Sequence, residues 1–219
     1  MTNPPSSSQP PTLQQIQQTF RDYKPKPLGI TKRYAVLMPL IDTPSGLSLL
    51  YEVRAHGISQ SGDAAFPGGQ VEDGESFQAA ALRETEEELG ISRDQIELMG
   101  KMDMLVRHDR WIQCFVGYLG KHTPSDFTTN PNEVDHLFTL PVAKLLTLRP
   151  EWHTLKAEIQ VDDDFPYDRI PNGRHYHFFP QVSSVPFYPI KKEHLWGMTA
   201  ELTARWCELL RNEGEYYEK

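Results

Sequence analysis

The sequence has few of the features that mark membrane, secreted or zinc-binding proteins. It contains only two cysteines, Cys114 and Cys207, in apolar-rich segments and without the spacing of zinc ligands. We therefore expect buried thiols in a reducing compartment. No apolar run reaches the roughly 18 residues of a membrane-spanning helix, and no charged-then-apolar leader is present. These absences predict a cytoplasmic protein with no membrane partner.

An excess of positive charge is also absent. The formal net charge is −8 at pH 7, whereas a general nucleic-acid binder needs a basic face for its phosphate contacts. The composition therefore argues against a nucleic-acid partner. It does not exclude an anionic small substrate, because bound metal ions and a few local cations determine the field inside a site.

The 219 residues suit one domain with additions at its ends. Residues 1–11 are rich in Pro, Ser and Gln, which predicts a mobile tail. Residues 12–32 predict a short amphipathic helix with Thr12 as its N-cap, followed by a Pro-containing linker. The main domain is expected over residues 33–211, and a C-terminal tail over residues 212–219.

The hydrophobic periodicity of the chain predicts both short strands and helices. Strands are predicted for residues 34–41, 47–54, 101–106, 111–119 and 152–161, and helices for residues 12–23, 76–89, 141–148 and 196–210. The pattern indicates an α+β or α/β protein. In the last helix we expect Trp206, Leu209 and Leu210 to face the core. His175 and His177 would share one face of a strand in a structural role.

Residues 66–91, FPGGQVEDGESFQAAALRETEEELGI, combine a glycine turn, an acidic loop and a helix. Gly68 and Gly69 can bring main-chain atoms close to a ligand, because glycine has no Cβ. Residues 76–89 are strong helix formers, and Gly90 is a typical helix stop.

One face of this helix is acidic. Glu84, Glu87 and Glu88 fall within an arc of about 100° beside the apolar stripe. Three neighbouring carboxylates repel one another unless a cation lies between them, and Mg²⁺ or Mn²⁺ prefers such oxygen ligands. The alternative is a solvated acidic face, which is the usual fate of a charge run.

The spacing of these residues resembles the signature of the Nudix hydrolases, G-x5-E-x7-R-E-U-x-E-E-x-G-U, where U is aliphatic. Every fixed position is matched between Gly69 and Ile91, and only Thr85 departs from the aliphatic preference. The resemblance implies a Nudix fold, in which a mixed β-sheet is sandwiched between helices, and a cofactor of Mg²⁺ or Mn²⁺. It also assigns roles to single residues. It implies metal ligands at Glu84, Glu88, Glu87 and the Gly69 carbonyl, and a loop brace between Glu75 and Arg83.

The segment before the helix is similar to the upstream motif of the coenzyme A pyrophosphatase branch, LLTxR(S/A)-x3-R-x3-G-x3-FPGG. Arg54, Gly62 and the residues Phe66 to Gly69 match it, so the resemblance implies substrate contacts at Arg54, Phe66 and Gly68. The sequence departs from the motif in four ways. Tyr51 replaces Thr, one extra residue precedes Arg54, a residue near Ser59 replaces the second Arg, and the loop is one residue shorter.

Two further loops complete the predicted site. Arg107 and Arg110 lie in a basic connection that can contact substrate phosphates, or can be a solvated hairpin tip. Residues 130–142 resemble the NPxEVxxxFxVPL segment of the same branch, which implies that Glu133 polarises the attacking water or binds metal.

These features together predict a metal-dependent hydrolase that cleaves the pyrophosphate of coenzyme A or acyl-CoA into 3′,5′-ADP and (acyl-)4′-phosphopantetheine. Glu87, Glu88 and Glu133 are the predicted catalytic residues. ADP-ribose, NADH or dinucleoside polyphosphates are alternative substrates, and a non-catalytic nucleotide sensor is a further alternative. The family resemblance also leads us to expect a homodimer.

Overall fold

The computed structural model describes residues 10–179 and 181–212. The helices are α1 (Leu13–Arg21), α2 (Phe77–Leu89), α3 (Val142–Leu145) and α4 (Gly197–Leu210). The strands are β1 (Lys32–Thr43), β2 (Gly46–Arg54), β3 (Ala64–Ala65), β4 (Gly68–Gln70), β5 (Glu97–Arg107), β6 (Arg110–Lys121), β7 (Val134–Pro141), β8 (Glu151–Ala157) and β9 (Gln181–Phe187). Most of the two predicted tails lies outside the described residues.

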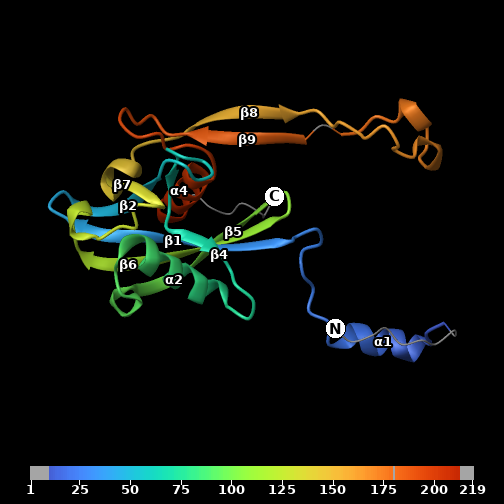
Figure 1. Ribbon diagram of the computed structural model, residues 1–219, viewed down its shortest axis with the longest axis horizontal. Coiled ribbons are helices and arrows are strands. Elements are labelled where there is room, and N and C mark those ends of the chain that lie inside the picture. Colours follow the sequence, from blue (N-terminus) through green and yellow to red (C-terminus); the bar gives the residue numbers. More distant parts are fainter. Residues whose placement is uncertain (1–9, 180, 213–219) are drawn as a thin grey trace.

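Seven strands form one mixed sheet (Figure 1). Its main path is β3-β2-β1-β6-β5, with β7 pairing to β2 and β4 pairing to β1. Strands β1 and β6 run parallel, whereas every other pairing in this sheet is antiparallel. The predicted hairpin of β1 and β2 is confirmed, with Leu40 opposite Leu49.

Helices α2 and α4 cover opposite faces of this sheet, because side chains alternate along its central strands. Leu37 and Leu50 belong to the core beneath α2, while Met38, Leu49 and Tyr51 belong to the core beneath α4. Both cysteines are buried on the α4 side. The predicted α+β architecture, a mixed sheet between helices, is confirmed.

Two segments extend away from this body, although the Phe187 end of β9 contacts Trp196 before α4 (Figure 1). Helix α1 has no buried residue, although the predicted Thr12 cap is present, with the Thr12 hydroxyl accepting from the Gln15 amide at 3.3 Å. Strands β8 and β9 form a separate antiparallel ribbon, and every residue of β8 is exposed. No helix among the described residues is long and apolar enough to cross a membrane.

Three local predictions are wrong. His175 ends a 3-10 turn and His177 lies in no element, because Asn172 and Gly173 turn the chain with φ of 65° and 52°. Leu209 and Leu210 are 39% and 50% exposed. The predicted turn at Gly68 and Gly69 is the short strand β4, whose two glycines pair with Val36 and Ala35 of β1.

The leucines are displaced because Arg211 makes the contacts at that end of α4. Its guanidinium donates to the carbonyls of Leu146 and Leu148 at 2.8 and 2.9 Å. A cation on backbone oxygens therefore connects the end of α4 to the segment after α3, where the sequence suggested apolar packing.

Candidate active site

Helix α2 carries most of the predicted site, and its sequence explains where it begins and ends. The Ser76 hydroxyl accepts a hydrogen bond from the Ala79 amide at 3.1 Å, which caps the first turn. Gly90 adopts a left-handed conformation with φ of 67°, and its N–H donates to the Glu86 carbonyl at 3.0 Å. The predicted helix is confirmed, with Gly90 as its stop.

Strand β4 lies directly against the acidic face of α2. The Gly68 N–H donates to Glu88 Oε2 at 2.8 Å. At Gly69, an added Cβ would come within 2.3 Å of the Glu84 carboxyl carbon. A side chain at this position would displace the Glu84 carboxylate, because strand and helix approach closely. The main chain of β4 and two carboxylates of α2 form one surface.

Two of the three helix carboxylates are withdrawn from water. Glu88 is 4% exposed. Its burial raises its pKa well above the ordinary 4.5, the Glu52 carboxylate raises it further, and the Gly68 N–H opposes both. Burial likewise raises the pKa of Glu84, against a hydrogen bond from Arg83. The Glu87 side chain is 53% exposed. A solvated acidic face therefore describes Glu87 but not Glu84 or Glu88.

Glu133 joins this group from the loop before β7. The Asn130 amide group donates to Glu133 Oε2 at 3.1 Å, and the Asn130 N–H donates to the Glu88 carbonyl at 3.0 Å, so the loop is fixed to the end of α2. The negative charge of Glu133 helps to raise the pKa of both Glu84 and Glu88. The structure thus brings together Glu84, Glu88 and Glu133 from two distant parts of the sequence.

Sequence reasoning missed a fifth carboxylate in this region, Glu52 of β2. Glu52 is 1% exposed, and its Oε2 has no hydrogen-bond partner among the described residues. Burial raises its pKa, the nearby Arg54 lowers it, and Glu133 and Glu84 raise it again. A signal was present in the sequence, because Glu52 is an acidic residue inside an otherwise apolar strand segment, LLYEV.

Arg83 connects the loop before α2 to the helix. Its guanidinium bonds both carboxylate oxygens of Glu75, at 3.1 and 3.2 Å, and the Gln70 carbonyl at 3.2 Å. It also contacts Glu84 at 2.8 Å and Glu87 at 3.2 Å. Glu75 and Glu84 raise the pKa of Arg83, and Arg83 lowers the pKa of Glu75. This geometry is what a loop brace requires.

The residues predicted to contact substrate differ in burial and in their present partners. Arg54 donates through Nε to the Ser59 carbonyl at 3.0 Å and lies near Glu52. Phe66 is buried, with its ring stacked on Tyr51 at 4.9 Å. Arg107 is held by both carboxylate oxygens of Glu201, at 2.6 and 2.7 Å.

Arg110, the second cation of the basic loop, begins β6 beside the start of β1. It pairs with Lys32 at the start of β1, three residues from Ala35, which is the partner of Gly69. Its guanidinium lies 5.7 Å from the centre of the Tyr34 ring. Of the two loop arginines, Arg110 therefore has the contacts that leave more of its charge available to a ligand.

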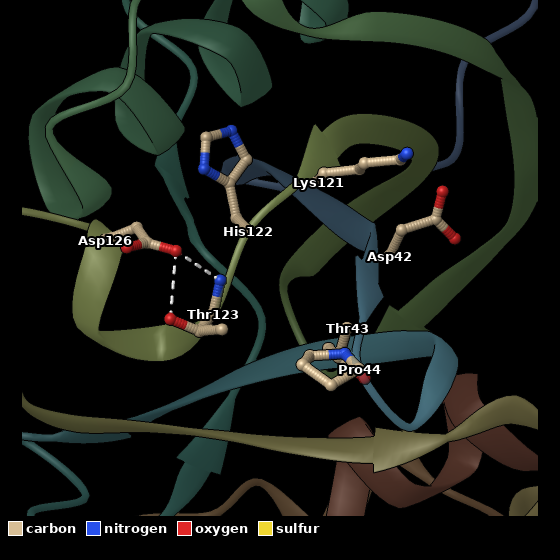
Figure 2. A pocket seen from close by; sticks show the side chains of 7 residues that line it. All are labelled: Asp42, Thr43, Pro44, Lys121, His122, Thr123 and Asp126. Atoms are coloured by element: carbon tan, nitrogen blue, oxygen red, sulfur yellow. Dashed lines mark hydrogen bonds between the residues drawn. The ribbon is translucent and has the colours of Figure 1, made fainter.

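A cavity of about 490 Å³ lies at the opposite end of β1, where Asp42, His122 and Asp126 contribute to its lining (Figure 2). Its carboxylates are already engaged. Tyr118 donates to Asp42 at 2.7 Å, and the Thr123 N–H and hydroxyl donate to Asp126 at 2.6 and 2.9 Å. The α2 carboxyl groups whose pKa values are raised, Glu84 and Glu88, do not line this cavity, so we assign it no catalytic role.

The carboxylates beside β4 have the donor chemistry that a hard divalent cation prefers. Their donor atoms are all oxygens, and Glu52 Oε2 is buried without a hydrogen-bond partner among the described residues. Among residues 10–179 and 181–212, no three His, Cys, Asp or Glu side chains form a ready set of metal ligands. Arg83 now contacts Glu84, and the Gly68 N–H contacts Glu88.

Known proteins are similar in sequence to the part of the chain that contains this site. Residues 31–184 match the family profile described as the NUDIX domain. Nudix hydrolase 3 of Caenorhabditis elegans is 33% identical over 116 residues, covering 51% of this chain and 48% of the relative. An uncharacterized Nudix hydrolase, NudL, of Yersinia pestis is 34% identical over 126 residues, covering 57% of this chain and 62% of the relative. The chain thus spans about half to three-fifths of the length of these relatives.

A solved structure of a MutT/nudix family protein from Enterococcus faecalis covers 92% of this chain and 70% of its own, at 15% identity and a TM-score of 0.49. That likeness is too low to add to the assignment, which depends on the family profile and its coverage of residues 31–184. The profile covers well over half of the sequence, and it includes every carboxylate gathered beside β4. The chain belongs to the Nudix family, whose members act on pyrophosphate bonds of nucleoside diphosphate derivatives.

Proposed function

We propose that this protein is a divalent-metal-dependent pyrophosphohydrolase that cleaves coenzyme A or acyl-CoA into 3′,5′-ADP and (acyl-)4′-phosphopantetheine. The observation that carries the hydrolytic part is the gathering of Glu84, Glu88 and Glu133 against Gly68 and Gly69. The coenzyme A part is supported by the upstream motif around Arg54 and the segment that contains Glu133.

Glu84 and Glu88 would hold Mg²⁺ or Mn²⁺, with Glu87 and the Gly69 carbonyl as further ligands. A cation bound there supplies neutralisation of pyrophosphate charge and a lowered pKa of water. The chain's own contribution is to bury these carboxylates and to fix their positions. Gly68 orients Glu88 through its N–H, and the brace of Glu75 and Arg83 positions the first turn of α2.

Glu133 is the favoured group to accept the proton of the attacking water. It is half-buried, oriented by Asn130 and close enough to raise the pKa of Glu88. Glu87 is a weaker choice because it is half-exposed and already paired with Arg83 at 3.2 Å. Glu88 is assigned both as a metal ligand and as a catalytic residue, because a metal-bound carboxylate also changes the electric field around the attacking water.

Cations for the substrate phosphates come from two segments. Arg54 lies beside Glu52 at the end of β2, and Arg110 lies at the start of β6. Arginine suits phosphate because its planar guanidinium can bond two oxygens at once. Gly68 belongs to the same proposed surface through the main chain of β4, whereas the Phe66 ring is buried against Tyr51. Arg107 reaches this surface only if Glu201 releases it.

A second proposal keeps the chemistry and changes the substrate to ADP-ribose, NADH or a dinucleoside polyphosphate. Its support is the absence of a second Arg near Ser59, where the Ser59 carbonyl instead accepts from Arg54 at 3.0 Å. A non-catalytic sensor is the weakest alternative, because the catalytic carboxylates are all retained.

A homodimer is also part of the proposal. Helix α1 exposes Leu13 and Phe20, and the ribbon of β8 and β9 exposes Trp152 and Leu155. Exposed apolar side chains on elements outside the main body are candidates for contacts with a second chain. Light scattering after size-exclusion chromatography will give a mass of two chains if the proposal holds, and a mass of one chain if it does not.

The test is product identification by mass spectrometry. The purified protein is incubated with Mn²⁺ and, separately, with coenzyme A, ADP-ribose, NADH and diadenosine polyphosphates, and each reaction is repeated with EDTA. We expect 3′,5′-ADP, with coenzyme A as the best substrate and no product in EDTA. Cleavage of the other substrates alone would leave the hydrolytic assignment and remove coenzyme A.

A further inference from the structure

Glu52 belongs to this carboxylate group, but neither the Nudix signature nor the segment that contains Glu133 assigns it a role. It lies in the middle of the apolar strand β2, where Leu50, Tyr51 and Val53 are all buried. An ionised carboxylate without a partner in such surroundings is costly, since burial removes its hydration without replacing it. A side chain at this position therefore needs a compensating contact.

The strand geometry directs Glu52 toward the face covered by α2. Side chains alternate along β2, so Glu52 shares a face with Leu50, which packs beneath α2, and not with Tyr51, which packs beneath α4. Backbone pairing with Ala65 of β3 brings Glu52 close to the start of β4. Glu52 thus reaches the carboxylates of α2 from the sheet below them.

The charged groups that act on Glu52 are mostly negative. Glu88, Glu84 and Glu133 surround it, and Arg54 is the cation that acts on it. No described donor bonds its Oε2, so neither a shared proton with Glu88 nor a hydrogen bond from Arg54 satisfies that oxygen. Glu52 Oε2 lies among carboxylates and accepts no hydrogen bond from a described N–H or O–H group. Such an oxygen is a suitable ligand for a cation.

We infer that Glu52 supplies an oxygen ligand to a divalent cation held between β2 and α2. This inference rests on the proposed function and adds to it a ligand from outside the signature helix. It explains why a charged side chain occupies a core position, and it places the cation deeper than the exposed Glu87.

Two consequences distinguish a metal ligand from a structural residue. Glu52→Gln preserves shape but removes one negative charge, so Mn²⁺ affinity should fall by about 10- to 100-fold, the scale of losing one supporting group at a metal site. In the metal-free protein, the same change relieves repulsion among buried carboxylates and should raise Tm. A structural role predicts the opposite pattern, a lower Tm and an unchanged affinity.

The experiment is a Mn²⁺ titration of the full chain without substrate, followed by electron paramagnetic resonance of the free ion and by calorimetry. Wild type, Glu52→Gln, Glu88→Gln and the control Glu86→Gln are compared. Glu86 is on the same helix, but it pairs with Arg93 at 2.6 Å outside the carboxylate group. We expect weaker binding for Glu52→Gln and Glu88→Gln, and wild-type binding for Glu86→Gln.

Equal Mn²⁺ affinity of wild type and Glu52→Gln would overturn the inference while leaving the proposed function intact. Absence of Mn²⁺ binding by the wild type would instead overturn the proposed function. A second measurement avoids the variant altogether. In crystals of the wild type soaked in MnCl₂, anomalous scattering should place manganese about 2.0–2.4 Å from a Glu52 oxygen. Manganese bound only to other carboxylates would contradict the inference.

Discussion

Gly69→Ala tests whether the close approach of β4 to α2 is what positions the catalytic carboxylates. The new Cβ would lie 2.3 Å from both the carboxyl carbon and Oε1 of Glu84. Nonbonded carbon atoms settle at about 3.5–4.0 Å, so the carboxylate must move by more than about 1 Å. Glu84 ends a flexible side chain, and the displacement can occur without unfolding the helix.

The expected effect is on rate, with little effect on folding. A misplacement of about 1 Å at a reacting group costs about 100-fold, which corresponds to about 2.7 kcal/mol of activation free energy. We therefore expect kcat/KM for coenzyme A with Mn²⁺ to fall by about 100-fold. The melting temperature, measured by calorimetry, should stay within a few degrees of wild type.

Gly100→Ala is the matched control. Gly100 lies in β5 of the same sheet, and an added Cβ there has nothing within 4 Å. Its kcat/KM should equal that of the wild type. If Gly69→Ala also kept wild-type kcat/KM, the contact between β4 and Glu84 would have no catalytic importance, and the reasoning would be refuted.

Three further predictions concern the same region. Glu75→Gln weakens the two hydrogen bonds with Arg83 and should cost about 1–2 kcal/mol, lowering Tm by about 2–8 °C in calorimetry. An unchanged Tm would show that this pair does not brace the loop. Gly68→Ala places a Cβ 2.3 Å from a carbonyl oxygen of β1, which cannot retreat as a side chain can, so Tm should fall further than in Gly69→Ala. In EDTA, Tm should fall as pH rises, because the pKa of Glu88 is raised from 4.5 to about 9 on folding and the folded state therefore holds the extra proton across that window. Glu88→Gln should reduce that slope, and a Tm that rises over the same window would contradict the burial argument.

The sequence was sufficient for features that depend on local interactions. Helix α2 was predictable because its cap at Ser76, its uninterrupted helix formers and its stop at Gly90 all lie within the segment itself. The hairpin of β1 and β2 was predictable for the same reason, since two apolar runs flank a short turn.

Features that depend on contacts between distant segments were less accessible. Nothing local indicates that β4 pairs with β1, so Gly68 and Gly69 read as a turn although they form a strand. Glu52 was overlooked because its importance comes from residues 32 or more positions away that only the fold brings together. Leu210 is exposed instead of lying in the core, and at this end of α4 Arg211 contacts the Leu146 carbonyl.

The substrate contacts form a third class, in which the sequence suggested charge but not its partners. Arg107 and Arg110 are equivalent in the sequence, yet Glu201 of α4 neutralises the first and no comparable carboxylate pair is described for the second. A distance of 94 positions separates Arg107 from Glu201, which no local pattern can reveal.

The most direct test of the account is the rate of coenzyme A cleavage by wild type and by Glu88→Gln, measured side by side with Mn²⁺. Glu88 is the carboxylate that contacts β4, is the most buried carboxylate of α2 and is predicted to hold the cation. We predict a folded variant whose rate is lower by orders of magnitude. Turnover close to that of the wild type would contradict the central claim that these carboxylates carry the chemistry.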